Sequence, residues 1–158
     1  MTLLLSLFLM CSQAGGVSAA KMSALEFSAI KQHPIADQSC IPPAHRRISF
    51  RIRNQSNKAV YIHGRKSTTD YIPLGYLMRL DREKNQWVNP EGNTSYRPYR
   101  EVEMYASDVY VLPPGRSMTF DNWAELTYVG SKFKQGIYIS FSENEEPRMV
   151  TSEEFILR

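Results

Sequence analysis

Histidines and carboxylates are the side chains of this 158-residue chain that could carry metal or acid–base chemistry. His33, His45 and His63 lie 12 and 18 residues apart, a spacing that matches no local metal-binding motif. Paired carboxylates can hydrolyse glycosides, but only when a cleft holds them about 5–10 Å apart. The carboxylates near the C-terminus fall instead in an expected turn and on an expected exposed strand, where charge discourages aggregation: Glu143, Glu145, Glu146, Glu153 and Glu154. The sequence therefore predicts a protein with no catalytic residue, no metal and no cofactor.

Cysteine chemistry is limited to two residues, Cys11 and Cys40. An all-cysteine zinc site or a cysteine-held iron–sulfur cluster needs four thiolates, and these two cysteines are too far apart for a zinc finger. Cys11 falls in a segment that we expect to be removed, which leaves Cys40 without a partner for an internal disulfide. Cys40 is then a small buried residue, a free thiol or half of an intermolecular bridge. Catalytic use of Cys40 would need a histidine nearby in space.

The first twenty residues have the pattern of a signal peptide. Residues 3–10 form an apolar run that is too short to span a bilayer as a mature helix, and small residues follow it. We expect cleavage after Ala19 or Ala20, although no Lys or Arg precedes the apolar run; a buried N-terminal helix is the alternative. No long apolar run occurs after residue 20. The mature protein is therefore expected to be periplasmic or secreted, with no stable membrane insertion after signal cleavage.

A long irregular segment concentrates side chains that suit recognition. The stretch begins at residues 89–93, Asn-Pro-Glu-Gly-Asn, and Trp87 lies just upstream of it. Tyrosine gives a large contact area at small entropic cost, and arginine adds directional hydrogen bonds. The loop holds four such residues: Tyr96, Arg97, Tyr99 and Arg100. A binding loop is our interpretation, and the alternative is that the tyrosines are ordinary strand residues.

Alternating apolar and polar residues predict the strands that would position this loop. Residues 48–54 alternate strictly, with Ile48, Phe50 and Ile52 on the expected core face and Arg51 and Arg53 on the solvated face. Further strands are expected near residues 59–63, 76–80, 87–88, 102–106, 109–112, 117–121, 137–141 and 148–157. Residues 124–129 fit either a strand or a short helix. No run of helical period exceeds two turns.

These elements predict one all-β domain. About seven to nine short strands, spaced by turns, are typical of an antiparallel β-sandwich. We expect a signal peptide at residues 1–20, an N-terminal arm at 21–45 that could add an edge strand, and the sandwich at 46–158.

Two stretches resemble the immunoglobulin or fibronectin type III superfold as it occurs in exported bacterial modules. They are the strand pair ISFRIRNQSNKAVYI and the pairing of LPPGRSMTF with the later GIYISF. The resemblance covers residues 46–157 in outline and implies an Ig-like sandwich. It also implies that Tyr138 forms a tyrosine corner, with its hydroxyl bonded back to nearby backbone. The resemblance raises the prospect of an adhesion, inhibitor or chaperone-like role without selecting one.

Charge is distributed unevenly along the chain. Residues 46–100 contain twelve Lys and Arg against four Asp and Glu, whereas residues 101–158 contain five against ten. If the basic half lies on one sheet, Arg51 and Arg53 would help to present a positive face to an acidic partner. The alternative is that the two halves neutralise each other across paired strands.

We therefore expect an exported, non-enzymatic protein-binding module, such as an inhibitor or immunity protein. Its contacts would be the Tyr/Arg-rich loop, Trp87 and the basic strand face of Arg51 and Arg53, and its partner would be another protein with an acidic surface. A second hypothesis is a glycan or cell-envelope binding domain, in which Trp87, Tyr96 and Tyr99 stack on sugar rings. A third is a hydrolase that uses Cys40 or the carboxylates. No nucleic acid partner is expected, because export separates the protein from most nucleic acid.

Overall fold

The computed structural model describes residues 24–34, 45–89 and 105–158, and these residues form two antiparallel sheets. The smaller sheet has the order β1–β2–β8 and consists of β1 (Leu25–Gln32), β2 (His45–Asn54) and β8 (Ser117–Glu125). The larger sheet has eight strands. Five of them follow the order β4–β3–β9–β5–β6, and the other three branch from this path, with β7 paired to β3 and with β10 and β11 paired to β9. The predicted all-β, antiparallel fold class is confirmed.

The strands of the larger sheet are mostly short. They are β3 (Val60–Lys66), β4 (Tyr71–Pro73), β5 (Gly75–Asp81), β6 (Gln86–Val88), β7 (Asp108–Leu112), β9 (Lys132–Ser140), β10 (Arg148–Thr151) and β11 (Phe155–Ile156). The described residues contain no α-helix, and a 3-10 turn lies at Leu126–Tyr128. Accordingly, no helix in the described ranges is long and apolar enough to cross a membrane. The described ranges contain eleven strands rather than seven to nine, because short pairings such as β4 carry too few residues for an alternation pattern.

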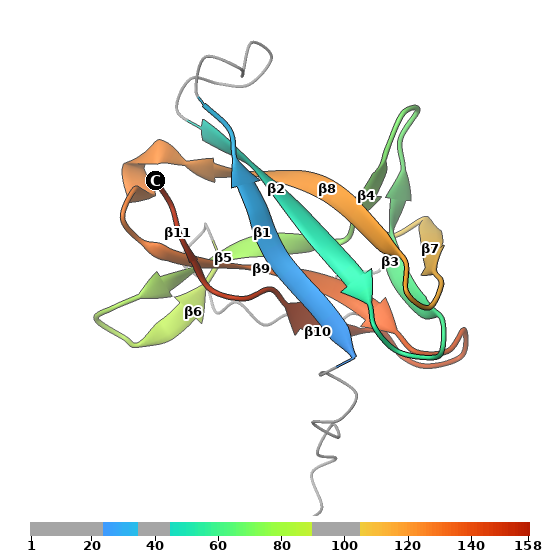
Figure 1. Ribbon diagram of the computed structural model, residues 1–158. Helices are drawn as coiled ribbons and strands as arrows, with labels where there is room; N and C mark the ends of the chain where they lie inside the picture. The colour runs from blue at the N-terminus through green and yellow to red at the C-terminus, as the bar shows by residue number, and fades with distance from the viewer. Residues whose placement is uncertain (1–23, 35–44, 90–104) are drawn as a thin grey trace, which may run out of the picture.

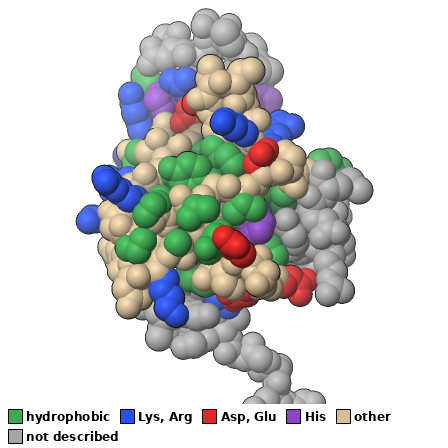
Figure 2. Space-filling model, turned by 90° about the vertical axis from the view of Figure 1, so that its right-hand side faces the viewer, with side chains coloured by type: hydrophobic (Ala, Val, Ile, Leu, Met, Phe, Trp, Pro, Cys, Tyr) green, Lys and Arg blue, Asp and Glu red, His purple; other side chains and the backbone are tan. Residues whose placement is uncertain are grey.

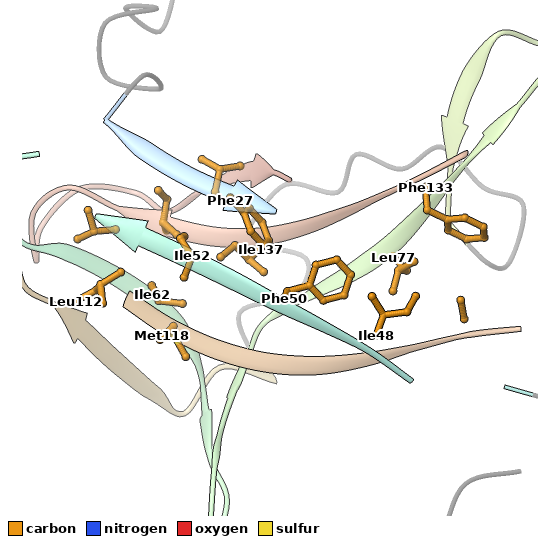
Figure 3. Close-up of a cluster of buried hydrophobic side chains, with 14 of the residues drawn as sticks. Phe27, Ile48, Phe50, Ile52, Ile62, Leu77, Leu112, Met118, Phe133 and Ile137 are labelled. Carbon is orange, nitrogen blue, oxygen red and sulfur yellow. The ribbon is translucent and has the colours of Figure 1, made fainter. Parts of the chain in front are cut away.

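The two sheets lie face to face and enclose one core. Figure 1 shows β1, β2 and β8 crossing in front of β9 and β5. Ile48, Phe50 and Ile52 of β2 are fully buried, as the alternation predicts, and they face Ile137 of β9 and Ile62 of β3 (Figure 3). Each sheet therefore contributes one apolar face, and burial of these faces is the main source of stability.

Phenylalanines fill one part of this core. The ring of Phe50 stacks on Phe120 of β8 with centroids 5.6 Å apart and meets the edge of Phe155 of β11 at 5.7 Å. Phe155 in turn stacks on Phe133 of β9 at 5.9 Å. Such ring pairs add about 0.5–1.5 kcal/mol beyond their area burial, and here they join the smaller sheet to the larger one.

The expected strand at residues 148–157 is interrupted. Ser152 N–H donates to Gln135 O of β9 at 2.8 Å, but Glu153 N–H donates to Phe27 O of β1 at 2.9 Å. The backbone therefore switches its hydrogen bonds from the larger to the smaller sheet between β10 and β11. Alternation of side chains does not reveal such a switch, which is why the sequence predicted one continuous strand.

Two turns are fixed by particular residues. Gly115, after Pro113 and Pro114, has φ of 71°, which is the positive value expected for glycine in this turn. Asn54, at the end of β2, is fully buried. Its side-chain Nδ2 donates to Lys58 O at 2.7 Å and to Leu112 O at 3.0 Å, so it ties the turn after β2 to the end of β7.

Candidate interaction surface

The two sheets are open along the side where β7 and β8 lie. β8 ends the strand order of the smaller sheet, and β7 pairs only with β3 among the described strands. β7 continues through the turn at residues 113–116 into β8, so consecutive strands form neighbouring edges of the two sheets. In Figure 1, β7 lies on the right-hand side with β3 and β4, and β8 runs from there across the molecule toward the upper left.

Exposed apolar side chains gather on this side of the molecule. Figure 2 views it directly and shows hydrophobic side chains across its middle, with Lys and Arg toward the margins. The large apolar residues that are exposed on β4, β7 and β8 are Ile72, Val109, Tyr110, Val111 and Trp123, and we call these five residues the apolar edge surface. Val109 and Val111 are each 48% exposed. Large contiguous apolar areas on a protein surface mark sites of interaction.

A groove runs between the two edges. It has a volume of about 750 Å³, and its walls include Tyr71, Ile72 and Tyr110 from the larger sheet and Phe120 and Trp123 from β8. The rings of Tyr71 and Tyr110 lie 5.4 Å apart at 47°. Aromatic side chains therefore line both walls of this groove, which we call the edge groove.

Tyr71 is fixed in place by the backbone above it. Its hydroxyl donates to Ile62 O at 2.7 Å and to Asp108 O at 3.0 Å. These carbonyl groups belong to β3 and β7, so the tyrosine on β4 supports the pairing of the two strands.

A network of four polar side chains lies at the far end of the edge groove. Arg47 Nη2 lies 3.0 Å from His33 Nδ1, His33 Nε2 lies 2.7 Å from Ser49 Oγ, and Ser49 Oγ donates to Asp121 Oδ1 at 2.6 Å. Arg47 Nε also lies 3.8 Å from Asp121 Oδ2, which closes the ring of contacts. Arg47, Ser49 and Asp121 line the groove itself.

The direction of these hydrogen bonds decides what the network can do. An arginine only donates, so Nδ1 of His33 accepts and its Nε2 carries the proton that is donated to Ser49. Ser49 passes its own proton toward Asp121 and not toward His33. In a hydrolase, the histidine takes the proton of the serine nucleophile. The network thus cross-links β2, β8 and the buried His33 that follows β1, and its bonds run opposite to those of a serine–histidine relay.

Acidic groups predominate where the groove meets β7. Lys66 N–H, 3.0 Å from Asp108 Oδ2, and the Ser107 hydroxyl lower the pKa of Asp108, so this carboxylate is charged. Asp70 lies in the same region and accepts from the hydroxyl of Thr69 at 2.7 Å. A second hollow of about 400 Å³ contains Lys66, Asp70 and Asp108, which is two carboxylates against one ammonium.

Trp87, Arg51 and Arg53, three of the predicted site residues, are not brought together. Arg51 and Arg53 lie on β2, on the face of the smaller sheet opposite the core. Trp87 lies on β6, and Lys134 Nζ of β9 sits 4.5 Å from the centre of its ring. The basic face and the tryptophan therefore belong to different sheets. The other four predicted residues, Tyr96, Arg97, Tyr99 and Arg100, lie outside the described residues, as does Cys40.

Part of the positive charge on the smaller sheet is matched by neighbouring carboxylates. Arg51 Nη2 lies 3.4 Å from Glu26 of β1, and Arg47 contacts Asp121 of β8. Arg53 makes no ion pair among the described residues. Cross-strand pairing thus offsets some of the charge asymmetry that the sequence shows.

The C-terminal carboxylates do not converge on one site. Glu154 contacts Lys132 at 3.2 Å and Lys134 at 3.4 Å, and the Lys132 hydrogen bond lowers its pKa. Glu145 contacts Arg148 at 3.5 Å and accepts from Phe141 N–H. Within the ranges that the structure describes, no three His, Cys, Asp or Glu residues are grouped so as to hold a metal ion.

Sequence reasoning predicted β7 as a strand but missed its role as an edge. A signal was available, because residues 108–112 contain no Lys, no Pro and no glycine that would protect an edge from pairing. The polar network had no such signal. Ser49 is 16 residues from His33 and 72 from Asp121, and only the sheet pairing brings them into contact.

Comparisons with known proteins do not place the chain in a family. No family model and no curated protein matches it. A Bordetella pertussis structure provisionally named ApaA is similar, with 17% identity and a TM-score of 0.48 over 84% of this chain and 91% of that one. The structural-genomics target SoR45 has 12% identity and a TM-score of 0.40 over 84% of this chain and 81% of that one. Neither likeness is close enough to assign a function.

Proposed function

We propose that this protein is a non-enzymatic module that binds another protein through the apolar edge surface. The observation that carries this proposal is the exposure of both faces of one edge strand, with Val109 and Val111 on one face and Tyr110 on the other, where Tyr110 lines the edge groove. A monomer that had no partner would leave this apolar area in water at a cost in solubility. Burying it against a partner removes apolar area from water, which favours association.

The polar groups around the groove support a binding role. Ser49 donates to the Asp121 carboxylate and not to His33, so the histidine does not take the serine proton as it does in a serine hydrolase. Aromatic residues at the centre and polar ones at the rim are the usual anatomy of a protein interface. An inhibitor or immunity protein, exported to the periplasm or secreted, remains the specific role that we propose.

Two predicted contact regions complete the proposal. The fold would be an Ig-like sandwich, and its Tyr96–Arg100 loop would add contacts to those of the edge. Arg53, which makes no ion pair among the described residues, would meet an acidic area of the partner. The glycan hypothesis is less favoured, because Lys134 already occupies one face of the Trp87 ring on which a sugar would stack.

Site-specific photocrosslinking in the cells that make the protein tests the proposal. A photoreactive phenylalanine analogue is placed at Val109 or Ile72, and, as matched controls, at Val129 or Ile156. The control side chains are 54% and 51% exposed but lie away from the apolar edge surface. We expect one discrete protein adduct from the edge positions and none from the controls. Equal labelling at all four positions, or none at the edge, would refute the proposed surface.

A further inference from the structure

The proposed function leaves open how the partner is held, and the backbone of β7 bears on this. Leu74 N–H donates to His63 O at 2.7 Å, on the side of β3 that faces away from β7. Backbone groups alternate in direction along a strand. The backbone N–H and C=O groups of Ile62 and Gly64 must therefore point toward β7, and they form the hydrogen bonds between β3 and β7.

The same alternation applies to β7 itself. Tyr110 is opposite Ile62, so its N–H and C=O point to β3. Val109 and Val111 are opposite His63 and Tyr61, and their backbone groups point to the outer side of β7, where no described strand pairs with them. Unpaired groups on an edge strand form a ready template for another strand.

We infer that β7 receives an extended segment of the partner protein as an additional strand of the larger sheet. This inference rests on the proposed function and names its binding mode. Main-chain hydrogen bonds to Val109 and Val111 would give the affinity, and alternate side chains of the segment would give the specificity. Side chains on one face would pack on Val109 and Val111, which favours valine, isoleucine or threonine there.

Charge specifies the other face of the incoming segment. Its side chains enter the hollow that contains Lys66, Asp70 and Asp108 next to Tyr110. Two carboxylates against one ammonium favour a lysine or arginine of the segment at this point. A second copy of this chain fits less well, because its β7 has no cation and would bring Asp108 into the same region. The occupant that fits is therefore a β-branched, alternating segment with one basic residue.

The test uses a displayed library of random peptides. Each peptide has about twelve residues, which is about twice the length of a typical strand. The library is selected on the immobilised full-length protein, and each selected peptide is measured in solution against two variants. Val111→Pro removes the outward N–H but no hydrogen bond to β3, whereas Val111→Thr keeps the N–H and the β-branched shape. We expect alternating peptides with one basic residue, bound at least about tenfold more weakly by Val111→Pro than by Val111→Thr.

Two further measurements make the outcome decisive. N-methylation of every second residue of a selected peptide should abolish binding when it blocks the N–H groups that point to β7. It should leave binding intact when it blocks the N–H groups in between. Asp70→Asn should weaken only peptides with a basic residue. Equal binding by the Pro and Thr variants, or equal effects of the two methylation registers, overturns strand addition. The proposed function would still stand if crosslinks form at Val109. A dimer at micromolar concentration that Val111→Pro dissolves would identify a second copy as the occupant and overturn the inference.

Discussion

The hydroxyl of Tyr71 lies 2.7 Å from the carbonyl oxygen of Ile62, so a side chain on β4 is bonded to the ladder between β3 and β7. The same hydroxyl reaches Asp108 O at 3.0 Å. The free edge is thus supported from the core side by one phenol group.

Removing that hydroxyl should weaken the edge. Tyr71→Phe keeps the ring beside Tyr110 but leaves two carbonyl groups with one donor fewer, so we expect a loss of about 1 kcal/mol in the free energy of unfolding. Urea unfolding measures it. Tyr61→Phe on β3 is the control, because its hydroxyl makes no hydrogen bond within the part of the chain that the structure describes, and its effect should stay within about 0.5 kcal/mol. Equal losses in the two variants would contradict the role of Tyr71.

Asn54 should be among the most sensitive polar residues of the described part. Its side chain donates to Lys58 O and Leu112 O and accepts from the N–H and hydroxyl of Ser56. Asn54→Ala removes the buried hydrogen bond to Leu112 O and the part-buried bonds to Lys58 and Ser56, and we expect a loss of about 2–4 kcal/mol. Asn57→Ala, at an exposed position of the same turn, should change the stability by less than about 0.5 kcal/mol. A similar loss for both variants would show that the turn as a whole, not Asn54, matters.

Two glycines should respond differently to the same substitution. A Cβ at Gly75 would overlap the carbonyl oxygen of Gly136 on β9, which is backbone and cannot move aside. Gly75→Ala should therefore cost about 3 kcal/mol or more. Gly115 has open space around its Cβ position but φ of 71°, so Gly115→Ala should cost only about 1 kcal/mol of backbone strain. Thermal unfolding checks the order, and the reverse order would refute this account of the close β5–β9 approach.

His63 should make the stability depend on pH. Burial lowers the pKa of His63 below its ordinary value of 6.5, so the unfolded chain takes up a proton at a higher pH than the folded one. The contribution of His63 to the free energy of unfolding is therefore fully present above about pH 6.5. It is lost as the pH falls from there through the lowered pKa of the folded protein. Urea unfolding at about pH 7.5 and about pH 5 should show a smaller pH-dependent loss in His63→Gln than in the unmodified protein. Ser140→Ala, which removes a hydrogen-bond partner but not the burial, should retain the dependence.

The part of the fold that follows from periodicity could be predicted. The alternation at residues 48–54 correctly placed Ile48, Phe50 and Ile52 in the core, and the Pro-Pro-Gly turn was assigned correctly. The pairing of sheets could not be predicted, because it depends on contacts such as Phe50 with Phe155 that join distant parts of the chain.

The candidate surface depended on the same missing information. The stretch at 109–111 looks like any buried strand until one knows that, among the described strands, β7 pairs with β3 alone. Trp87 and Arg51 were chosen by residue type, which does not tell whether a side chain is engaged by Lys134 or Glu26. Residue type predicted an aromatic interaction surface, whereas the order of the strands decided that this surface lies along β7.

The position of β9 at the centre of the larger sheet also constrains when that sheet can form. β9 pairs with β3 and β5, which precede it, and with β10 and β11, which follow it. A chain synthesised from its N-terminus has no centre for this sheet until residues 132–140 have emerged, and pairings over such long separations form slowly. Most of the chain would therefore leave the ribosome before it can fold. An unfolded chain is what a secretion channel accepts, so this order of strands would suit the export that we propose.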